Sequence, residues 1–203
     1  MTFRFFAAGL ALLVLTACGA EPQYLPEAAP SKLRVRAAVD TLLVQTVSLP
    51  TYAADDKISY QDAEGVVRSR NFGLWADEPE RATTLAMTRH LNAMTSAKVA
   101  SEPWPLPEPP TGVLDIRFET MIATNSNTFR IKGQYYMGSE IPDPITYDDP
   151  DKEPKELPAP LADKVGLFDI AIPLPEATPA AITRAQAAAL TALAERIARD
   201  LSR

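Results

Sequence analysis

The fold class follows from Gly112-Val113-Leu114-Asp115-Ile116-Arg117-Phe118-Glu119-Thr120-Met121-Ile122, in which apolar and charged side chains alternate. Alternation with a period of two is typical of a β-strand that buries one face. A second alternating segment, residues 128–137, follows after Thr124-Asn125-Ser126-Asn127. Asparagine and serine favour turns, so the two segments predict a pair of long strands joined in a meander.

The segments on either side predict further strands and two helices. Helices are expected from Asp77 to about Ser96 and from Thr178 to about Leu201, since each begins with a capping residue close to a proline. Strands are expected at residues 33–36, 42–47, 98–100 and 165–172, and a hairpin at residues 57–69. This order predicts an α/β fold: a single compact sandwich of a mostly antiparallel sheet with helices packed on one face.

The N-terminus has the pattern of an export signal. Arg4 precedes an apolar run of about ten residues, which is too short to cross a bilayer. Leu15-Thr16-Ala17-Cys18 then places a leucine three residues before the only cysteine of the chain. This stretch resembles the lipobox of bacterial lipoproteins, which implies cleavage before Cys18 and attachment of acyl chains such as palmitate. An ordinary signal peptide with a chance cysteine is the alternative.

The residue after the cysteine bears on which membrane holds the anchor. In the sorting rule known for many Gram-negative lipoproteins, an acidic residue at that position favours the inner membrane. The residue here is Gly19, so the resemblance favours the outer membrane, with the protein facing the periplasm.

The predicted organisation has three parts. Residues 1–17 form the signal peptide, residues 18–31 a lipidated tether and residues 32–203 one domain, in which residues 139–163 form a loop rich in proline and acidic residues. The net charge of −6 and the lack of a basic stripe argue against a nucleic-acid partner. Because Cys18 carries the lipid, no intrachain disulfide is expected.

The search for catalytic residues finds no constellation. The only histidine, His90, falls in the middle of a predicted helix beside its apolar stripe, where a structural or surface role is expected. The acidic residues Asp148, Asp149 and Asp151 are the one candidate metal site, but they lack the order of an EF-hand loop, and a solvated loop is favoured. We therefore expect neither an enzyme nor a cofactor, unless that acidic run binds a catalytic metal.

Three apolar side chains are candidates for contact with a partner. Leu85 points away from the predicted stripe of Met87, Leu91 and Met94 on its helix. Trp75 and Trp104 flank predicted elements and could stack on a ligand, although aromatic residues in such places are more often lids on the core.

The order of several short motifs behind the lipobox-like stretch completes the sequence evidence. The motifs are Leu49-Pro50-Thr51-Tyr52, Trp75-Ala76-Asp77-Glu78-Pro79 before a helix, and Pro103-Trp104-Pro105. Through these motifs the chain resembles the auxiliary lipoprotein component of ABC-type transport systems. This is the family of paraquat-inducible protein C, which is associated with MCE-domain proteins. Two features depart from that family: the insert at residues 139–163 is longer than expected, and the tether retains only Tyr24-Leu25 of its usual start.

The resemblance implies a non-enzymatic role at the outer membrane. Such lipoproteins dock the periplasmic end of an MCE assembly that carries phospholipid between membranes, and docking to a ring-shaped partner favours a homo-oligomer. A pilotin-like or barrel-assembly lipoprotein, which chaperones an outer-membrane protein without lipid traffic, is the alternative.

Overall fold

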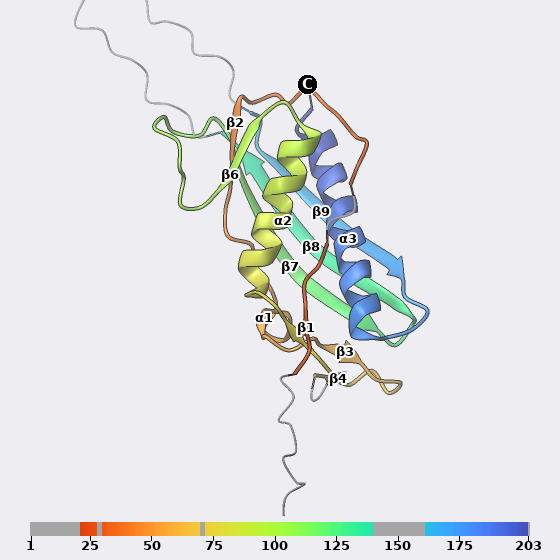
Figure 1. Ribbon diagram of the computed structural model, residues 1–203. Coiled ribbons are helices and arrows are strands. Elements are labelled where there is room, and N and C mark those ends of the chain that lie inside the picture. The colour runs from red at the N-terminus through yellow and green to blue at the C-terminus, as the bar shows by residue number, and fades with distance from the viewer. Residues whose placement is uncertain (1–20, 28–29, 70–71, 140–160, 203) are drawn as a thin grey trace, which may run out of the picture.

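A computed structural model describes residues 21–27, 30–69, 72–139 and 161–202. Two long helices lie side by side over one face of a twisted sheet, as Figure 1 shows. Buried apolar side chains from both layers form one cluster between them. Its largest fully buried members include Leu42, Ile58, Met87, Leu91, Leu114, Ile116, Phe129, Ile131, Tyr135, Ile182 and Leu190.

The predicted meander is present and gains a third strand. β7 (Val113–Thr124), β8 (Thr128–Gly138) and β9 (Lys164–Pro173) pair antiparallel in sequence order. Leu114, Ile116 and Phe118 are buried as the alternation predicts. A shift of register between Phe118 and Thr120 then moves the buried face from even to odd numbers, so that Met121 also faces the core.

The rest of the sheet contains several parallel pairs, which corrects the expectation of a mostly antiparallel sheet. β2 (Thr41–Val44) lies between β6 (Lys98–Ser101) and β7 and is parallel to both. Parallel neighbours need a long crossover, and α2 (Pro79–Met94) supplies it between β2 and β6. The fold is therefore a mixed α/β fold, whose sheet combines antiparallel and parallel pairs.

A small hairpin closes the far end of β7. β3 (Tyr60–Gln61) and β4 (Val67–Arg68) pair antiparallel, within the hairpin predicted at residues 57–69. Tyr60 pairs in parallel with Ala123 near the end of β7, and its ring lies 4.3 Å from that of Phe72. A short helix, α1 (Thr51–Ala54), follows Pro50, where the preceding strand pattern was expected to stop.

The two long helices begin with different caps. α3 (Pro179–Asp200) starts as predicted, since Thr178 Oγ1 accepts a hydrogen bond from Ala181 N at 3.3 Å. For α2 the expectation was wrong: the N-cap is Glu78, without a side-chain hydrogen bond. Asp77 lies one residue further out and pairs with Arg81.

Residues 33–36, predicted as a strand, form no strand in the structure. Val35 N instead donates to Met94 O at 2.8 Å, and Ala38 N donates to Leu201 O at 2.8 Å. The last carbonyl groups of a helix have no partner within the helix. Residues 35–38 therefore supply donors at the C-terminal ends of both α2 and α3 instead of joining the sheet.

Two short strands were not expected. β1 (Gln23–Tyr24) lies within the predicted tether and pairs in parallel with β5 (Leu74–Trp75), just before α2. The chain is thus attached to the domain from Pro22 onward, since Pro22 O accepts a hydrogen bond from Leu74 N at 3.1 Å.

Candidate functional site

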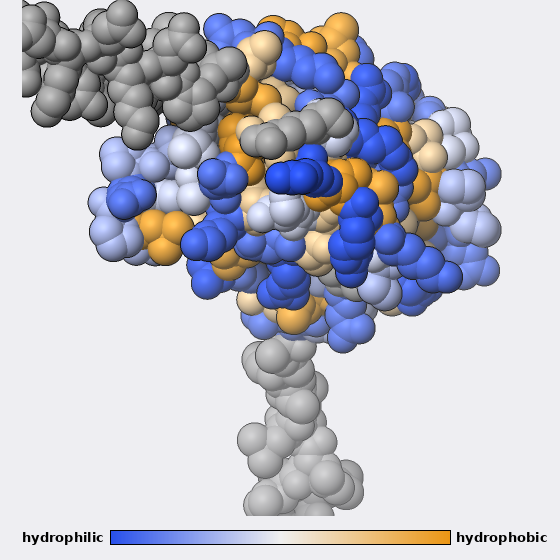
Figure 2. Space-filling view, turned by 90° about the horizontal axis from the view of Figure 1, so that it is seen from above, coloured by the Kyte–Doolittle hydropathy of each residue, from blue (hydrophilic) through white to orange (hydrophobic). Residues whose placement is uncertain are grey.

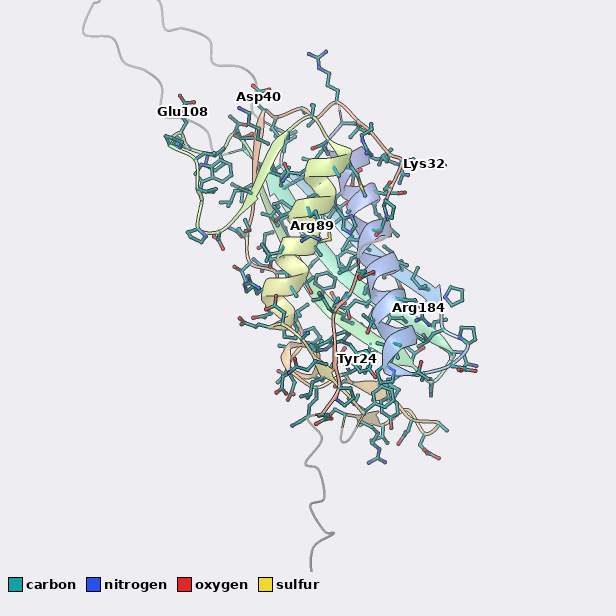
Figure 3. All side chains as sticks on the ribbon, in the orientation of Figure 1. Tyr24, Lys32, Asp40, Arg89, Glu108 and Arg184 are labelled. Atoms are coloured by element: carbon teal, nitrogen blue, oxygen red, sulfur yellow. The ribbon has the colours of Figure 1, made fainter. Side chains whose placement is uncertain are left out.

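Leu85 borders a groove between the helices. Thr83, Met87, Leu91 and Met94 are buried and form the predicted stripe on α2, whereas Leu85 remains 37% exposed. The groove has a volume of about 140 Å³ and lies between α2, α3 and the segment that follows β1. Leu25, Pro26, Ala86 and Leu190 contribute apolar walls, and Arg89, near the middle of α2 in Figure 3, contributes a cationic edge.

The size and lining of the groove indicate what it can accept. Small-molecule sites usually enclose roughly 300 Å³ or more, so this groove is too small for a typical ligand. A single apolar side chain of a protein partner would fit, and protein interfaces often place such an anchor in a small pocket. One buried hydroxyl lines the groove without a hydrogen-bond partner in the described structure, that of Thr83.

His90 is buried at the interface of the two helices. It is 5% exposed, and its Nε2 lies 3.4 Å from Thr191 Oγ1 on α3. Burial, and to a lesser degree the charge of Arg89, holds the pKa of His90 below its usual value. A neutral imidazole packed between helices fits the structural role expected from the sequence.

Trp75 is held in β5 and is partly buried. Its backbone N donates to Asp56 O at 2.7 Å, and its ring packs against the core cluster. Trp75 therefore resembles the core lid that the sequence offered as the alternative to a contact residue.

Trp104 lies in the proline-rich loop between β6 and β7. Its Nε1 donates to Glu108 O at 2.7 Å, which links two positions of the loop, and Leu106 between them is 39% exposed. Of the two tryptophans, only Trp104 belongs to a projecting loop.

The structure does not bring the three candidates together. Leu85 is on α2, Trp75 pairs with β1 at one end of the molecule, and Trp104 is in the loop whose Glu108 appears at the other end in Figure 3. They cannot form one contact patch on a single copy of the domain.

Sequence reasoning missed a second apolar surface, on β9. Val165 and Leu167 are 62% and 66% exposed and lie on one face of this strand. Within the described chain β9 pairs only with β8, so its outer edge is open. On the β6 edge, by contrast, the Asn92 side chain bonds both Val99 N and Val99 O. Alternation along residues 165–168 predicts which side chains share a face, but not that this face stays uncovered.

Two of the predicted sites lie outside the described residues: Cys18, and the acidic run of Asp148, Asp149 and Asp151. Among the residues that are described, no group of histidine, cysteine or acidic side chains could hold a metal ion. None of the described helices is both long enough and apolar enough to cross a membrane.

The fold and these surfaces define a class of protein: a mixed α/β domain that offers apolar contact surfaces on its helices and on an open sheet edge. The sequence model of one family matches residues 24–198, nearly the whole domain. The chain belongs to that family, the ABC-type transport auxiliary lipoprotein component.

Solved structures support the fold. One similar structure, of an uncharacterized protein, has a TM-score of 0.66 and 14% identity over 90% of this chain and 99% of its own. Protein XCC0632 from Xanthomonas campestris, of the DUF330 family, has a TM-score of 0.56 and 15% identity over 86% of this chain and 91% of its own. No curated protein sequence matches the chain.

Proposed function

We propose that this chain is an outer-membrane lipoprotein, anchored through Cys18 and facing the periplasm. It acts as a non-catalytic auxiliary component of an MCE-type ABC system for phospholipid transport between membranes. Its domain docks the periplasmic MCE-domain partner to the outer membrane. The observation that carries this proposal is the family match, which begins at residue 24, shortly after the lipobox-like stretch that ends at Cys18.

The geometry of the described domain supports docking through side chains. The groove beside Leu85 suits an apolar anchor, and its cationic edge at Arg89 suits an acidic or carbonyl group next to that anchor. Leu85, Trp75 and Trp104 are the contact residues we propose. The burial of Trp75 makes it the weakest of them.

The experiment that tests the proposal isolates the acylated protein from its own membranes in detergent and identifies co-purified proteins by mass spectrometry. Recovery of an MCE-domain protein supports docking. That recovery should survive the Cys18→Ser change, because the contacts belong to the domain and not to the lipid. Recovery of a secretin or a β-barrel protein instead would establish the pilotin-like alternative.

Matched variants locate the contact. Leu85→Arg adds a long charged side chain at the groove and should weaken association while the domain stays folded, since Leu85 is 37% exposed. Leu167→Arg makes the same change on the opposite layer and serves as control. If only the Leu167 variant loses the partner, the contact lies on β9. If Leu85→Arg unfolds the domain, Leu85 is a core residue and is no contact.

A further inference from the structure

The domain begins very close to Cys18. Pro22 O and Tyr24 O both accept hydrogen bonds from the β5 region, from Leu74 N at 3.1 Å and from Ala76 N at 2.9 Å. Three residues, Gly19, Ala20 and Glu21, separate Cys18 from Pro22. Each residue of an extended chain spans at most about 3.6 Å, so Pro22 lies within about 14 Å of the anchored residue.

The domain is much longer than this reach. β7 has 12 residues and runs from one end of the sheet to the other, so the domain is about 40 Å long at roughly 3.3 Å per residue. Tyr24 lies toward one end of the molecule in Figure 3, together with the hairpin β3–β4, whereas Asp40 and Glu108 lie at the other. The tether therefore enters at one end of an elongated body.

The end that receives the tether carries exposed apolar side chains. Val66 and Val67 are 46% and 44% exposed in the hairpin, although adjacent residues of a strand normally face opposite sides. The hairpin is held in shape by the Arg68–Asp62 ion pair at 2.8 Å. The opposite end, viewed in Figure 2, mixes hydrophilic and hydrophobic areas and includes the loop with Leu106, which is 39% exposed, so the short tether rather than apolar exposure distinguishes the hairpin end.

Charge at the tethered end limits how the hairpin meets lipid. Asp62 and Glu64 lie in the hairpin turn and Asp55 and Asp56 shortly precede it in the sequence, whereas Lys57 and Arg68 balance these four acidic residues only in part. Bacterial membranes contain anionic lipids, which repel such a surface. We therefore expect the lipid anchor, rather than charge attraction, to hold the hairpin against the membrane. The hairpin then stays at the level of the headgroups.

We propose that the hairpin end, made of β1, β5 and the β3–β4 hairpin, lies against the phospholipid headgroups of the membrane that holds the Cys18 lipid. The loop that bears Trp104 then points away from that membrane. The inference rests on the proposed lipid anchor at Cys18. It also separates the contact candidates, because Trp75 lies at the membrane end and Trp104 at the end that faces the periplasmic partner.

The chain's single cysteine makes a direct test possible. If the sulfur of Cys18 carries lipid, an introduced cysteine is the only free thiol. Val66→Cys, Leu106→Cys and Leu167→Cys change exposed residues at the hairpin, at the far loop and on the sheet face. Each full-length acylated variant is labelled with a fluorescent maleimide. It is then placed in vesicles of phosphatidylethanolamine and phosphatidylglycerol that contain a lipid with a nitroxide quencher on its headgroup.

The inference predicts strong quenching at residue 66 and little at residues 106 and 167, relative to the same samples in detergent. Quenching at residue 167 or 106 equal to that at residue 66 would overturn the orientation while leaving the anchor intact. If the wild-type protein reacts with the maleimide and does not float with vesicles, Cys18 carries no lipid. The proposed anchor and this inference then fail together.

Discussion

The ring of Tyr135 on β8 occupies the space in which a side chain at its β9 partner, Gly166, would lie. The ring is fully buried, and its hydroxyl donates to the Asp200 carboxylate near the end of α3. Lys164 pairs with the same carboxylate at 2.6 Å. Burial, reinforced by Asp200, raises the pKa of Tyr135 to about 12, so the phenol stays a hydrogen-bond donor at neutral pH. The absence of a side chain at Gly166 thus allows the Tyr135 ring to join β8 to α3.

Gly166→Ala should destabilise the domain. The added methyl group would overlap the Tyr135 ring, and overpacking of this kind costs about 1–3 kcal/mol. Urea unfolding followed by circular dichroism measures the effect. Val165→Ala, the same strand's neighbouring exposed position, should change stability by less than about 0.5 kcal/mol. Equal losses in the two variants would show that the Tyr135 ring can move aside.

The stability of the domain should decrease as the pH falls below about 6.5, the usual pKa of histidine. Burial lowers the pKa of His90 in the folded state, so between the two pKa values the unfolded chain binds more protons. The stability contribution of neutral His90 is therefore fully present above the unfolded pKa. It is lost as the pH falls through the folded pKa.

His90 is the only histidine, so its replacement gives a clean comparison. Urea midpoints at pH 7.5 and 5.5 should differ for the wild type and differ less for His90→Asn. An unchanged difference in the variant would assign the pH dependence to other groups.

Asn92→Ala should expose the edge of β6 and cost about 1–3 kcal/mol. The Asn92 side chain donates to Val99 O at 2.5 Å and accepts from Val99 N at 2.9 Å, so its removal leaves both backbone groups without this partner. Asn92→Asp keeps the acceptor and loses the donor, and should fall between the wild type and the alanine variant. A larger loss of stability in the aspartate variant than in the alanine variant would show that repulsion between the carboxylate and Val99 O outweighs the hydrogen bond kept with Val99 N.

Thr178→Ala should reduce stability by about 1 kcal/mol, because Thr178 caps α3 through Ala181 N. Asp77→Ala is the matched change before α2, where the side chain pairs with Arg81 on the surface and makes no cap. Surface pairs of this spacing contribute about 0.3–0.5 kcal/mol. Thermal denaturation of both variants should therefore rank Thr178→Ala as the more damaging.

Local sequence patterns predicted the structure of an element correctly where the residues of that element are sufficient to specify it. The alternation in residues 112–122 predicts β7, and the cap and proline at residues 178–179 predict the start of α3. The cap predicted at Asp77 failed although aspartate is the better capping residue, because the helix starts one residue later. The Asp77 side chain instead accepts a hydrogen bond from Glu78 N and pairs with Arg81. Short strands such as β1 and β5 carry two residues each, too few for any periodic signal.

Contacts between distant segments could not be read in this way. Residues 33–36 alternate like a strand, yet Val35 N donates to Met94 O at the end of α2, and Ala38 N, just beyond the segment, donates to Leu201 O at the end of α3. The direction in which β2 pairs depends on the crossover through α2, which no property of residues 41–44 encodes. The groove beside Leu85 likewise needs α2, α3 and Leu25 to come together.

The residue order alone was enough to predict the strands and helices with long periodic patterns, and to reveal the lipobox-like stretch at Cys18 and the family resemblance. These depend on the order and types of neighbouring residues. The mixed sheet, the partial burial of Trp75 against the core, and the placement of Trp75 and Trp104 at opposite ends became visible only in the folded domain. Those properties depend on which distant segments pack together, because burial and pairing are set by neighbours in space.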